Sequence, residues 1–293
     1  MDTFIIYNGE IKAKEKFSLD LSNRGFRFGD SIFETIRVFE GKIVFIEDHI
    51  KRLFTTLDIV RMNLPEYFTS EYLQKKIIDL IKLHDSKNLN ARIRLTVFRK
   101  ESKEIYFVDK GEYADFIIEY FPIESSNFII NKDKGYEIST YEKIKKASGL
   151  LSQIKSNNVL LHSIAGSVAR EKLLDNIILV NESDNLTEAV NANIFIGTDN
   201  IISTPKLEDG CVDGILRKKL MELIRERSPY SIIEREIHKD ELLQCDEVFL
   251  TNSIMGIQPV HKCKDKTYET EVSEKLSEII INEINLMLDQ QES

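Results

Sequence analysis

A lysine at position 155 stands where its amine could act as a nucleophile. It lies in the segment Ile154–Asn158, after small and apolar residues and just before an expected helix. Partial removal from water lowers the pKa of a lysine and leaves a neutral amine able to attack an aldehyde. For a lysine taken alone, a solvated side chain near a helix start is the commoner case. Lys155 is therefore a candidate nucleophile that needs support from other residues.

Two later patches could serve a cofactor that carries a pyridine ring and a phosphate. Glu188 lies between two apolar strands, and a carboxylate beside a pyridine nitrogen keeps that nitrogen protonated and the ring an electron sink. Gly214 opens an expected helix, so the free N–H groups of Ile215 and Leu216 could hold a phosphate. The plainer alternatives are a solvated turn glutamate and ordinary helix capping by Asp213.

Composition narrows the class of protein. The chain has 293 residues, 42% hydrophobic content and a net charge of −9, which suits two folded domains and argues against a nucleic-acid duplex or a membrane surface as partner. The N-terminus lacks a signal-peptide pattern, and no apolar stretch reaches the length of a membrane span. Three scattered cysteines, Cys211, Cys245 and Cys263, fit a reducing compartment. We expect a cytoplasmic protein, and the histidine spacing predicts no metal site.

The first part of the chain predicts an α+β domain. Asn8 and Gly9 favour a type I′ turn between two strands, and apolar residues at spacings of three and four indicate two helices. The expected strands are 4–7, 10–13, 33–39, 42–45, 92–98 and 115–121, and the expected helices are 46–60 and 70–83. Pro122 and the polar residues after it indicate a linker. We therefore expect a domain over 1–121 and a linker over 122–130.

The remaining residues, 131–293, predict a second domain that mixes short apolar strands with helices, which is typical of an α/β arrangement. The expected strands are 177–180, 194–196, 231–233 and 248–250. The expected helices are 158–174, 214–227 and the tail from 273 onward. No internal repeat interrupts this order.

Taken in order, these patches resemble the fold-type IV family of pyridoxal-phosphate enzymes. The family includes branched-chain aminotransferases, D-amino-acid aminotransferases and 4-amino-4-deoxychorismate lyases. The matching segments are Asn23–Thr35, Asp48–Leu53, Lys155, Glu188, Gly214–Arg217 and Asn252–Val260. The resemblance implies pyridoxal 5′-phosphate held as an aldimine on Lys155, with Glu188 at the pyridine nitrogen. It also implies a two-domain fold like that of D-amino-acid aminotransferase, and a homodimer.

The resemblance implies roles for further residues. Arg52, the N–H groups of Ile215 and Leu216 and the hydroxyl of Ser253 would bind the phosphate, and Asn193 is counted with the cofactor-binding residues. Thr35 is a candidate for proton delivery beside Lys155, although a strand threonine needs no such role. The candidates for substrate binding are Arg94, Arg99 and Asn252, although either arginine could form only an exposed ion pair.

The motifs favour one branch of the family. The segment after Lys155 lacks the tyrosine of branched-chain enzymes, and the loop 99–106 lacks the Arg-x-His pair of D-amino-acid enzymes. Asn252–Val260 is similar to a run found in many deoxychorismate lyases, although a glycine- and arginine-rich loop of some lyases is missing at 99–106. We expect a lyase of folate biosynthesis that releases pyruvate and 4-aminobenzoate. The alternatives are an aminotransferase for branched-chain or D-amino acids, and a non-catalytic relative, against which the intact lysine, glutamate and phosphate residues argue.

Overall fold

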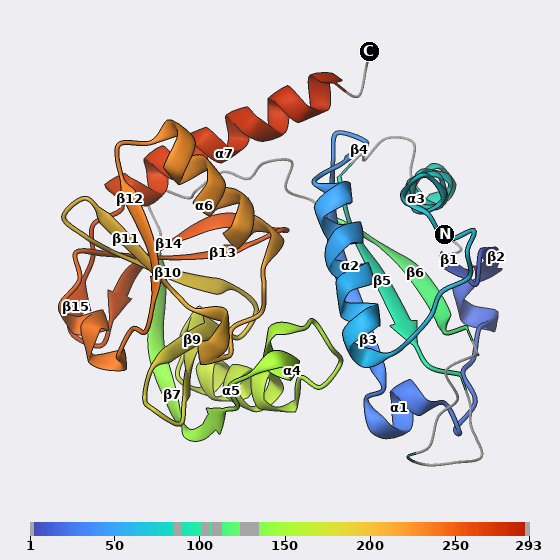
Figure 1. The fold of residues 1–293 in the computed structure, drawn as a ribbon, viewed down its shortest axis with the longest axis horizontal. Coiled ribbons are helices and arrows are strands. Elements are labelled where there is room, and N and C mark those ends of the chain that lie inside the picture. Colours follow the sequence, from blue (N-terminus) through green and yellow to red (C-terminus); the bar gives the residue numbers. More distant parts are fainter. Residues whose placement is uncertain (1–2, 85–89, 101–105, 107–112, 124–134, 291–293) are drawn as a thin grey trace. The chain divides into compact units, whose positions relative to one another are not determined.

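The computed structural model describes residues 3–84, 90–100, 106, 113–123 and 135–290 (Figure 1). The chain forms two compact units, each with its own β-sheet. The first unit contains Met1–Ser126 together with Lys155–Asn158, and the second contains Asn127–Ile154 and Val159–Ser293. The return of four residues to the first unit is a grouping that the sequence did not predict. Residues 124–130 of the expected linker lie outside the described residues.

The first unit is built on an antiparallel six-stranded sheet with the order β2-β1-β6-β5-β3-β4. The strands are β1 Phe4–Tyr7, β2 Glu10–Ala13, β3 Ser31–Phe39, β4 Lys42–Ile43, β5 Ala91–Phe98 and β6 Asp115–Pro122. The expected turn between β1 and β2 is confirmed, with φ of 49° at Asn8 and 89° at Gly9. The strand expected over 42–45 ends early, because Phe45 takes a left-handed conformation that starts the next helix.

Two helices, α2 (Ile46–Val60) and α3 (Ser70–His84), pack their apolar stripes against this sheet. A short helix, α1 (Arg24–Phe28), precedes β3, and a 3-10 turn, η1 (Lys14–Lys16), follows β2. Successive side chains of a strand point to opposite faces. Ile32, Ile36 and Val38 of β3 enter the core under the helices, while Phe33 and Thr35 point to the other face and stay half-buried. This alternation places the candidate residues of β3 away from the core.

The second unit is built on a mixed nine-stranded sheet in the order β12-β11-β10-β13-β14-β7-β8-β9, with β15 paired to β14 (Figure 1). Three of its strand pairs are parallel, and the others are antiparallel. The strands are β7 Tyr136–Lys146, β8 Asn176–Asn181, β9 Leu186–Ala189, β10 Asn193–Thr198, β11 Ile201–Pro205, β12 Ser231–Arg235, β13 Glu247–Asn252, β14 Gly256–Cys263 and β15 Lys266–Thr267. The two sheets with their helices confirm the expected fold class of mixed α+β and α/β type.

Four helices belong to the second unit: α4 Leu150–Gln153, α5 Leu160–Glu171, α6 Ile215–Arg227 and α7 Glu271–Gln290. Two 3-10 turns, η2 Leu207–Asp209 and η3 Lys239–Leu243, complete it. Helix α5 is shorter than the expected 158–174, whereas α6 and α7 follow the prediction closely. Among the residues that the structure describes, no helix is long and apolar enough to cross a membrane.

The sequence did not predict β7, β9, β11, β14 or β15. Strand β7 shows the reason, because only Ile138, Tyr141 and Lys146 are buried along its eleven residues and no period-2 pattern arises. Strand β14 contains Pro259, which argues against a strand when the partner is unknown. Strand β9 has only four residues, two of which are the buried polar side chains of Thr187 and Glu188.

Candidate active site

Lys155 lies in an extended segment of the first unit. The backbone N–H of Phe33 donates to the carbonyl of Lys155 (2.9 Å), and the N–H of Asn157 donates to the carbonyl of Ser31 (3.0 Å). Helix α5 begins at Leu160, two residues later than expected, so Lys155 precedes it by a short extended segment. The pairing with β3 fixes the backbone of the lysine. Its Nζ atom lies 4.5 Å from the centroid of the Phe33 ring.

Arg94 shares the Phe33 ring with Lys155. The guanidinium carbon of Arg94 lies 3.8 Å from the ring centroid, and its N–H groups donate to Asn157 (2.8 Å) and Thr96 (3.2 Å). Burial lowers the pKa of Arg94 from its usual value, but an arginine stays charged under such shifts. Thr35 stands directly opposite Arg94 in the register of β3 and β5. The structure thus brings the predicted Lys155, Thr35 and Arg94 to one face of the first sheet.

Two more arginines lie on this face. Arg37 is opposite Arg92 in the same register, two residues along each strand from Thr35 and Arg94. The Arg37 side chain is buried, and burial lowers its pKa. The guanidinium carbon of Arg92 lies 4.5 Å from the centroid of the Phe121 ring. Three guanidinium groups and one lysine amine lie on this face together with the carboxylate of Glu119, which stands opposite Arg94 and pairs with Lys14 (3.3 Å), so the face is positive on balance.

Arg52 belongs to a buried cluster between α2 and β3. Its Nε donates to Oε1 of Glu34 (2.8 Å), and Nδ1 of His49 lies 2.7 Å from Oε2 of the same carboxylate. Burial alone would raise the pKa of Glu34, but the Arg52 charge and the two hydrogen-bond partners outweigh it and lower the pKa to about 2. Burial lowers the pKa of His49, so this histidine is neutral and donates from Nδ1. The cluster fixes the direction of the Arg52 side chain.

Arg99 makes contacts that support a structural role. Its NH1 and NH2 groups donate to the carbonyls of Arg61 (3.0 Å) and Val60 (2.8 Å) at the end of α2. Its Nε donates to Asp30 (3.2 Å), which also accepts from Arg24 (2.9 Å). The guanidinium therefore caps the carbonyl end of α2 and joins an ion-pair cluster. The role of Arg99 in binding a substrate carboxylate stays a prediction. Residues 101–105 of the same loop lie outside the described residues.

Glu188 is the centre of the candidate site in the second unit. It is 4% exposed, and its Oε1 lies 2.9 Å from both the Lys146 ammonium and Nε2 of His162, while its Oε2 accepts the Val212 N–H (2.8 Å). Burial alone would raise the pKa of this carboxyl, but the Lys146 charge and the His162 hydrogen bond lower it overall. A solvated turn glutamate is therefore not what the structure contains. It contains a buried carboxylate held in its ionised form.

Asn193 links Glu188 to the start of α6. Its side-chain amide donates to the carbonyl of Val212 (2.8 Å), the residue whose N–H binds Glu188. A Cβ atom on Gly214 would lie only 1.9 Å from Oδ1 of Asn193, so only glycine fits there while Asn193 keeps this position. Gly214 is the N-cap of α6 and has no side chain to cap the helix. The predicted Ile215 and Leu216 thus form an uncapped first turn beside Asn193, where helix N–H groups favour an anion.

Thr251 adds a hydroxyl near the same place. It faces Asn193 in the register of β10 and β13, and within the described residues its buried Oγ1 atom has no hydrogen-bond partner. The next residue, Asn252, accepts the N–H groups of Ile254 (3.0 Å) and Met255 (2.7 Å) and so shapes the turn that contains Ser253. A hydroxyl without an acceptor beside an uncapped helix start suits a phosphate group.

Sequence reasoning missed three residues of this site, namely Lys146, His162 and Thr251. Lys146 ends a strand that had no recognisable pattern, and His162 was considered only as a metal ligand. Thr251 directly precedes the motif segment Asn252–Val260, and this position was the signal by which the sequence could have indicated it.

The three cysteines are buried, and burial raises the pKa of Cys211 and of Cys245 to about 12, which makes reactive thiols there unfavourable.

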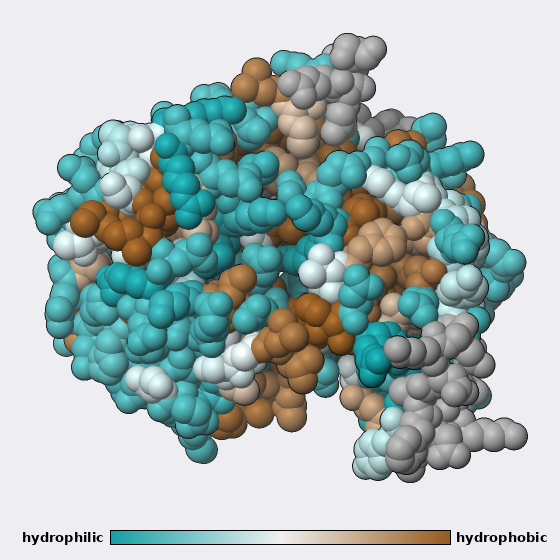
Figure 2. Space-filling model, in the orientation of Figure 1, coloured by the Kyte–Doolittle hydropathy of each residue, from teal (hydrophilic) through white to brown (hydrophobic). Residues whose placement is uncertain are grey.

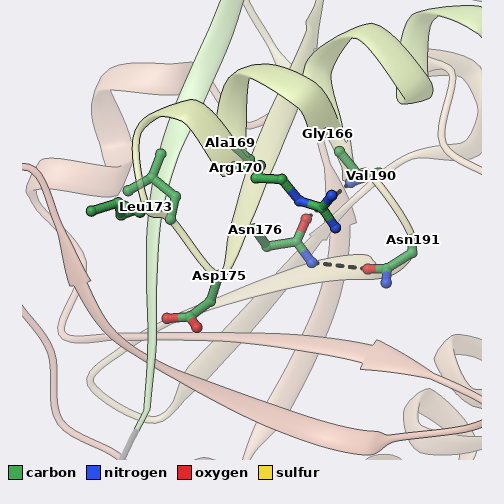
Figure 3. A pocket seen from close by; sticks show the side chains of 9 residues that line it. Gly166, Ala169, Arg170, Leu173, Asp175, Asn176, Val190 and Asn191 are labelled. Carbon is green, nitrogen blue, oxygen red and sulfur yellow. Dashed lines mark hydrogen bonds between the residues drawn. The ribbon is translucent and has the colours of Figure 1, made fainter.

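A surface pocket of about 450 Å³ lies elsewhere in the second unit, at the end of α5 (Figure 3). Its lining includes Arg170, Leu173 and Asp175, and the side chains of Asn176 and Asn191 point toward one another across its floor and are hydrogen-bonded (2.9 Å). None of the residues predicted for cofactor or substrate lines this pocket. The donors and charges described above, rather than this cavity, define the candidate site.

Comparison with known proteins assigns the family. A model of the class IV amino-transferases matches residues 31–263. D-alanine aminotransferase from Bacillus licheniformis is 25% identical over 263 residues, covering 90% of this chain and 89% of the relative. Aminodeoxychorismate lyase from Bacillus subtilis (strain 168) is 25% identical over 275 residues, covering 93% and 91%. The chain belongs to the class IV aminotransferase family, whose typical cofactor is pyridoxal phosphate.

Solved structures show the same fold. Branched-chain amino acid aminotransferase from Thermobaculum terrenum, solved in its pyridoxal-phosphate form, superposes with a TM-score of 0.83 at 20% identity and covers 97% of this chain and 94% of that chain. The sequence relatives named above divide between lyases and aminotransferases at the same 25% identity. They show a pyridoxal-phosphate-dependent class IV enzyme and leave its reaction to be argued from the site.

Proposed function

We propose that this enzyme is a 4-amino-4-deoxychorismate lyase, which converts its substrate into pyruvate and 4-aminobenzoate. The observation that carries the proposal is the positive face of the first sheet, where Lys155 and Arg94 share the Phe33 ring and two further arginines lie alongside. The substrate has two carboxylates and one amine. Several guanidinium groups beside one nucleophilic amine suit such a dianion better than a small neutral amino acid.

The turn after β13 gives a second line of support. Asn252 holds the turn through two backbone N–H groups, and β14 begins directly afterwards at Gly256. This turn belongs to the segment Asn252–Val260 that is similar to the lyases. Aminodeoxychorismate lyases are also among the relatives. An aminotransferase remains the second candidate, because a D-alanine aminotransferase matches at the same 25% identity as the lyase.

The residues present fit pyridoxal phosphate. We propose that Lys155 binds it covalently and that Glu188 pairs with its pyridine nitrogen, since this carboxylate stays ionised although it is buried. The first turn of α6 with Ile215 and Leu216 would receive the phosphate, together with Ser253 and the Thr251 hydroxyl, which has no partner among the described residues. Arg52 would add a guanidinium to the phosphate ligands, as the family resemblance implies, and Asn193 would keep the α6 turn in place.

When bound, the cofactor supplies an electron sink conjugated to the substrate nitrogen. Lys155 then acts as the base that removes the proton from the ring carbon carrying this nitrogen. The bond between the ring and the ether oxygen breaks, the ring becomes aromatic, and the enolpyruvyl group leaves. A proton delivered to its methylene carbon gives pyruvate, and Thr35, which lies on the same sheet face as Arg94, would assist this step. No water or second substrate is consumed, because the two products contain all atoms of the substrate.

The decisive experiment compares the two reactions directly. Purified holoenzyme given aminodeoxychorismate is expected to release pyruvate and 4-aminobenzoate in equal amounts, at a rate proportional to enzyme concentration. Separately, L-leucine or D-alanine should fail to convert the cofactor to its pyridoxamine form. Fast conversion by either amino acid, without any aminobenzoate from the first assay, would show an aminotransferase instead.

We also propose that the enzyme is a homodimer. Apolar side chains gather over α4 and α5 (Figure 2), where Leu151 is 72% and Leu160 is 75% exposed and Leu150 and Ile164 add to the patch. Such a patch is typical of a protein interface. Light scattering is expected to give twice the chain mass of 34.0 kDa. L151D/L160D should give the single mass, whereas L173D, which changes an exposed leucine beyond this patch, should not.

A further inference from the structure

Lys146 is a second buried lysine, and every proton of its ammonium group has an acceptor. It ends β7, is 6% exposed, and lies 2.9 Å from Oε1 of Glu188. It also donates to the carbonyls of Gly210 and Ser152, the latter at 3.3 Å. A lysine whose amine is surrounded by three acceptors in this way is held in place and is not exposed as a nucleophile. Its role must therefore be exerted through Glu188.

The loop around Gly210 is shaped to hold this pair. Gly210 has φ of 107°, and a Cβ atom there would lie 2.5 Å from the carbonyl oxygen of Ala147. Glycine thus allows the loop to approach β7 closely, so that its carbonyl reaches Lys146. Two residues later, the N–H of Val212 reaches the other oxygen of Glu188 (2.8 Å). The same short loop contacts both members of the ion pair.

Glu188 is compensated by groups of the protein itself. Its described partners are the Lys146 cation, the His162 ring and the Val212 N–H, so the pair with Lys146 has no net charge. A buried carboxylate that loses its cation is strongly destabilised. A pyridinium placed at the same carboxylate would be a second cation, attracted by Glu188 and repelled by Lys146. Lys146 and the cofactor nitrogen therefore act on one acceptor in the same way.

We propose that Lys146 is a positioning residue that stands in for the pyridine nitrogen: it keeps Glu188 ionised in the apoenzyme and shares this carboxylate with the pyridinium in the holoenzyme. The inference rests on the proposed function, in which Glu188 faces that nitrogen. It implies that the cofactor compensates for the loss of Lys146, because the pyridinium then supplies the cation that Glu188 needs. A purely structural lysine would give no such compensation.

The test measures thermal unfolding of the full chain with and without pyridoxal 5′-phosphate. K146M should lower the midpoint of the apoenzyme clearly and that of the holoenzyme less, so that the cofactor raises the midpoint of K146M by about 3–6 °C more than that of the wild type. K145M is the matched control. It removes the same charge from the neighbouring residue of β7, whose partner is Asp184. This control should show the wild-type rise.

A second pair of variants, both with the Glu188 carboxylate replaced, tests whether the effect of Lys146 depends on that carboxylate. In E188Q and K146M/E188Q, the cofactor should raise the midpoint by the same amount, because the negative charge shared by the two cations is gone. Equal rises in wild type and K146M would overturn the role of Lys146 while leaving the proposed function intact. If pyridoxal 5′-phosphate does not bind the wild type at all, the proposed function fails, and this inference with it. Should K146M not fold, K146Q, which keeps donors without charge, provides the same comparison.

Discussion

Lys155→Ala is expected to abolish turnover and covalent retention of pyridoxal phosphate while the fold stays intact. The lysine supplies both the attachment point and the proposed base, and loss of a general base alone costs roughly 10²–10⁴-fold in rate. The variant loses the contact between Lys155 Nζ and the Phe33 ring, but the fold should survive because the hydrogen bonds between residues 155–158 and β3 are made by the backbone and by Asn157. Circular dichroism and the thermal midpoint check the fold, and pyruvate release checks the rate.

Covalent attachment has its own measurement. Borohydride reduction of the wild-type holoenzyme, followed by digestion and mass spectrometry, should find the cofactor on Lys155 alone. Lys172→Ala is a suitable control, because Lys172 is the exposed C-cap residue of α5 and its removal should leave labelling unchanged. Label on Lys146 or Lys172 in the wild type would contradict the assignment of the nucleophile.

Arg52→Ala is expected to weaken cofactor binding and to destabilise the protein at the same time. The lost charge-assisted contact with phosphate corresponds to about 1.5–3 kcal/mol, which is roughly one to two powers of ten in the dissociation constant. The variant also leaves Glu34 buried without its main cation, and breaking such a pair generally costs about 3–5 kcal/mol. Fluorescence titration with pyridoxal phosphate and urea unfolding of the apoenzyme measure the two effects separately.

The double variant R52A/E34Q separates the two causes. It removes the buried charge together with its partner, so stability should return toward the wild type while cofactor affinity stays low. An unchanged dissociation constant in R52A would mean that Arg52 serves only the buried pair. The double variant should also lose part of the acid sensitivity. The folded-state pKa of Glu34 is about 2, below the usual 4.5, so its contribution is complete above pH 4.5 and disappears as the pH falls toward 2.

Local patterns in the sequence were sufficient for most of the first unit. The turn at Asn8 and Gly9 and the apolar spacing of α2 and α3 each depend on neighbours along the chain, and all three are present. Strand β7 could not be predicted in this way, because its burial depends on parallel partners far along the chain and its buried positions have no regular period.

The candidate site shows the same division. The motif at Lys155 and the glycine at 214 can be recognised from the residues themselves. The partners of Glu188 cannot, because Lys146 lies 42 positions before it and is brought there only by the sheet. The clustering of Arg37, Arg92 and Arg94 is likewise a property of the register between β3 and β5, which no single segment encodes.

The return of residues 155–158 to the first unit has a consequence for synthesis on the ribosome. The first unit is discontinuous in sequence, since its last four residues follow a stretch that belongs to the second unit. Its sheet can therefore begin to assemble once residue 126 has emerged, but β3 lacks the backbone partners supplied by Lys155 and Asn157 until some thirty residues more have left the exit tunnel. The residue proposed to carry the cofactor thus belongs to the last segment of its unit to be synthesised. Its amine appears on the sheet at the same time as β3 gains its last backbone hydrogen bonds.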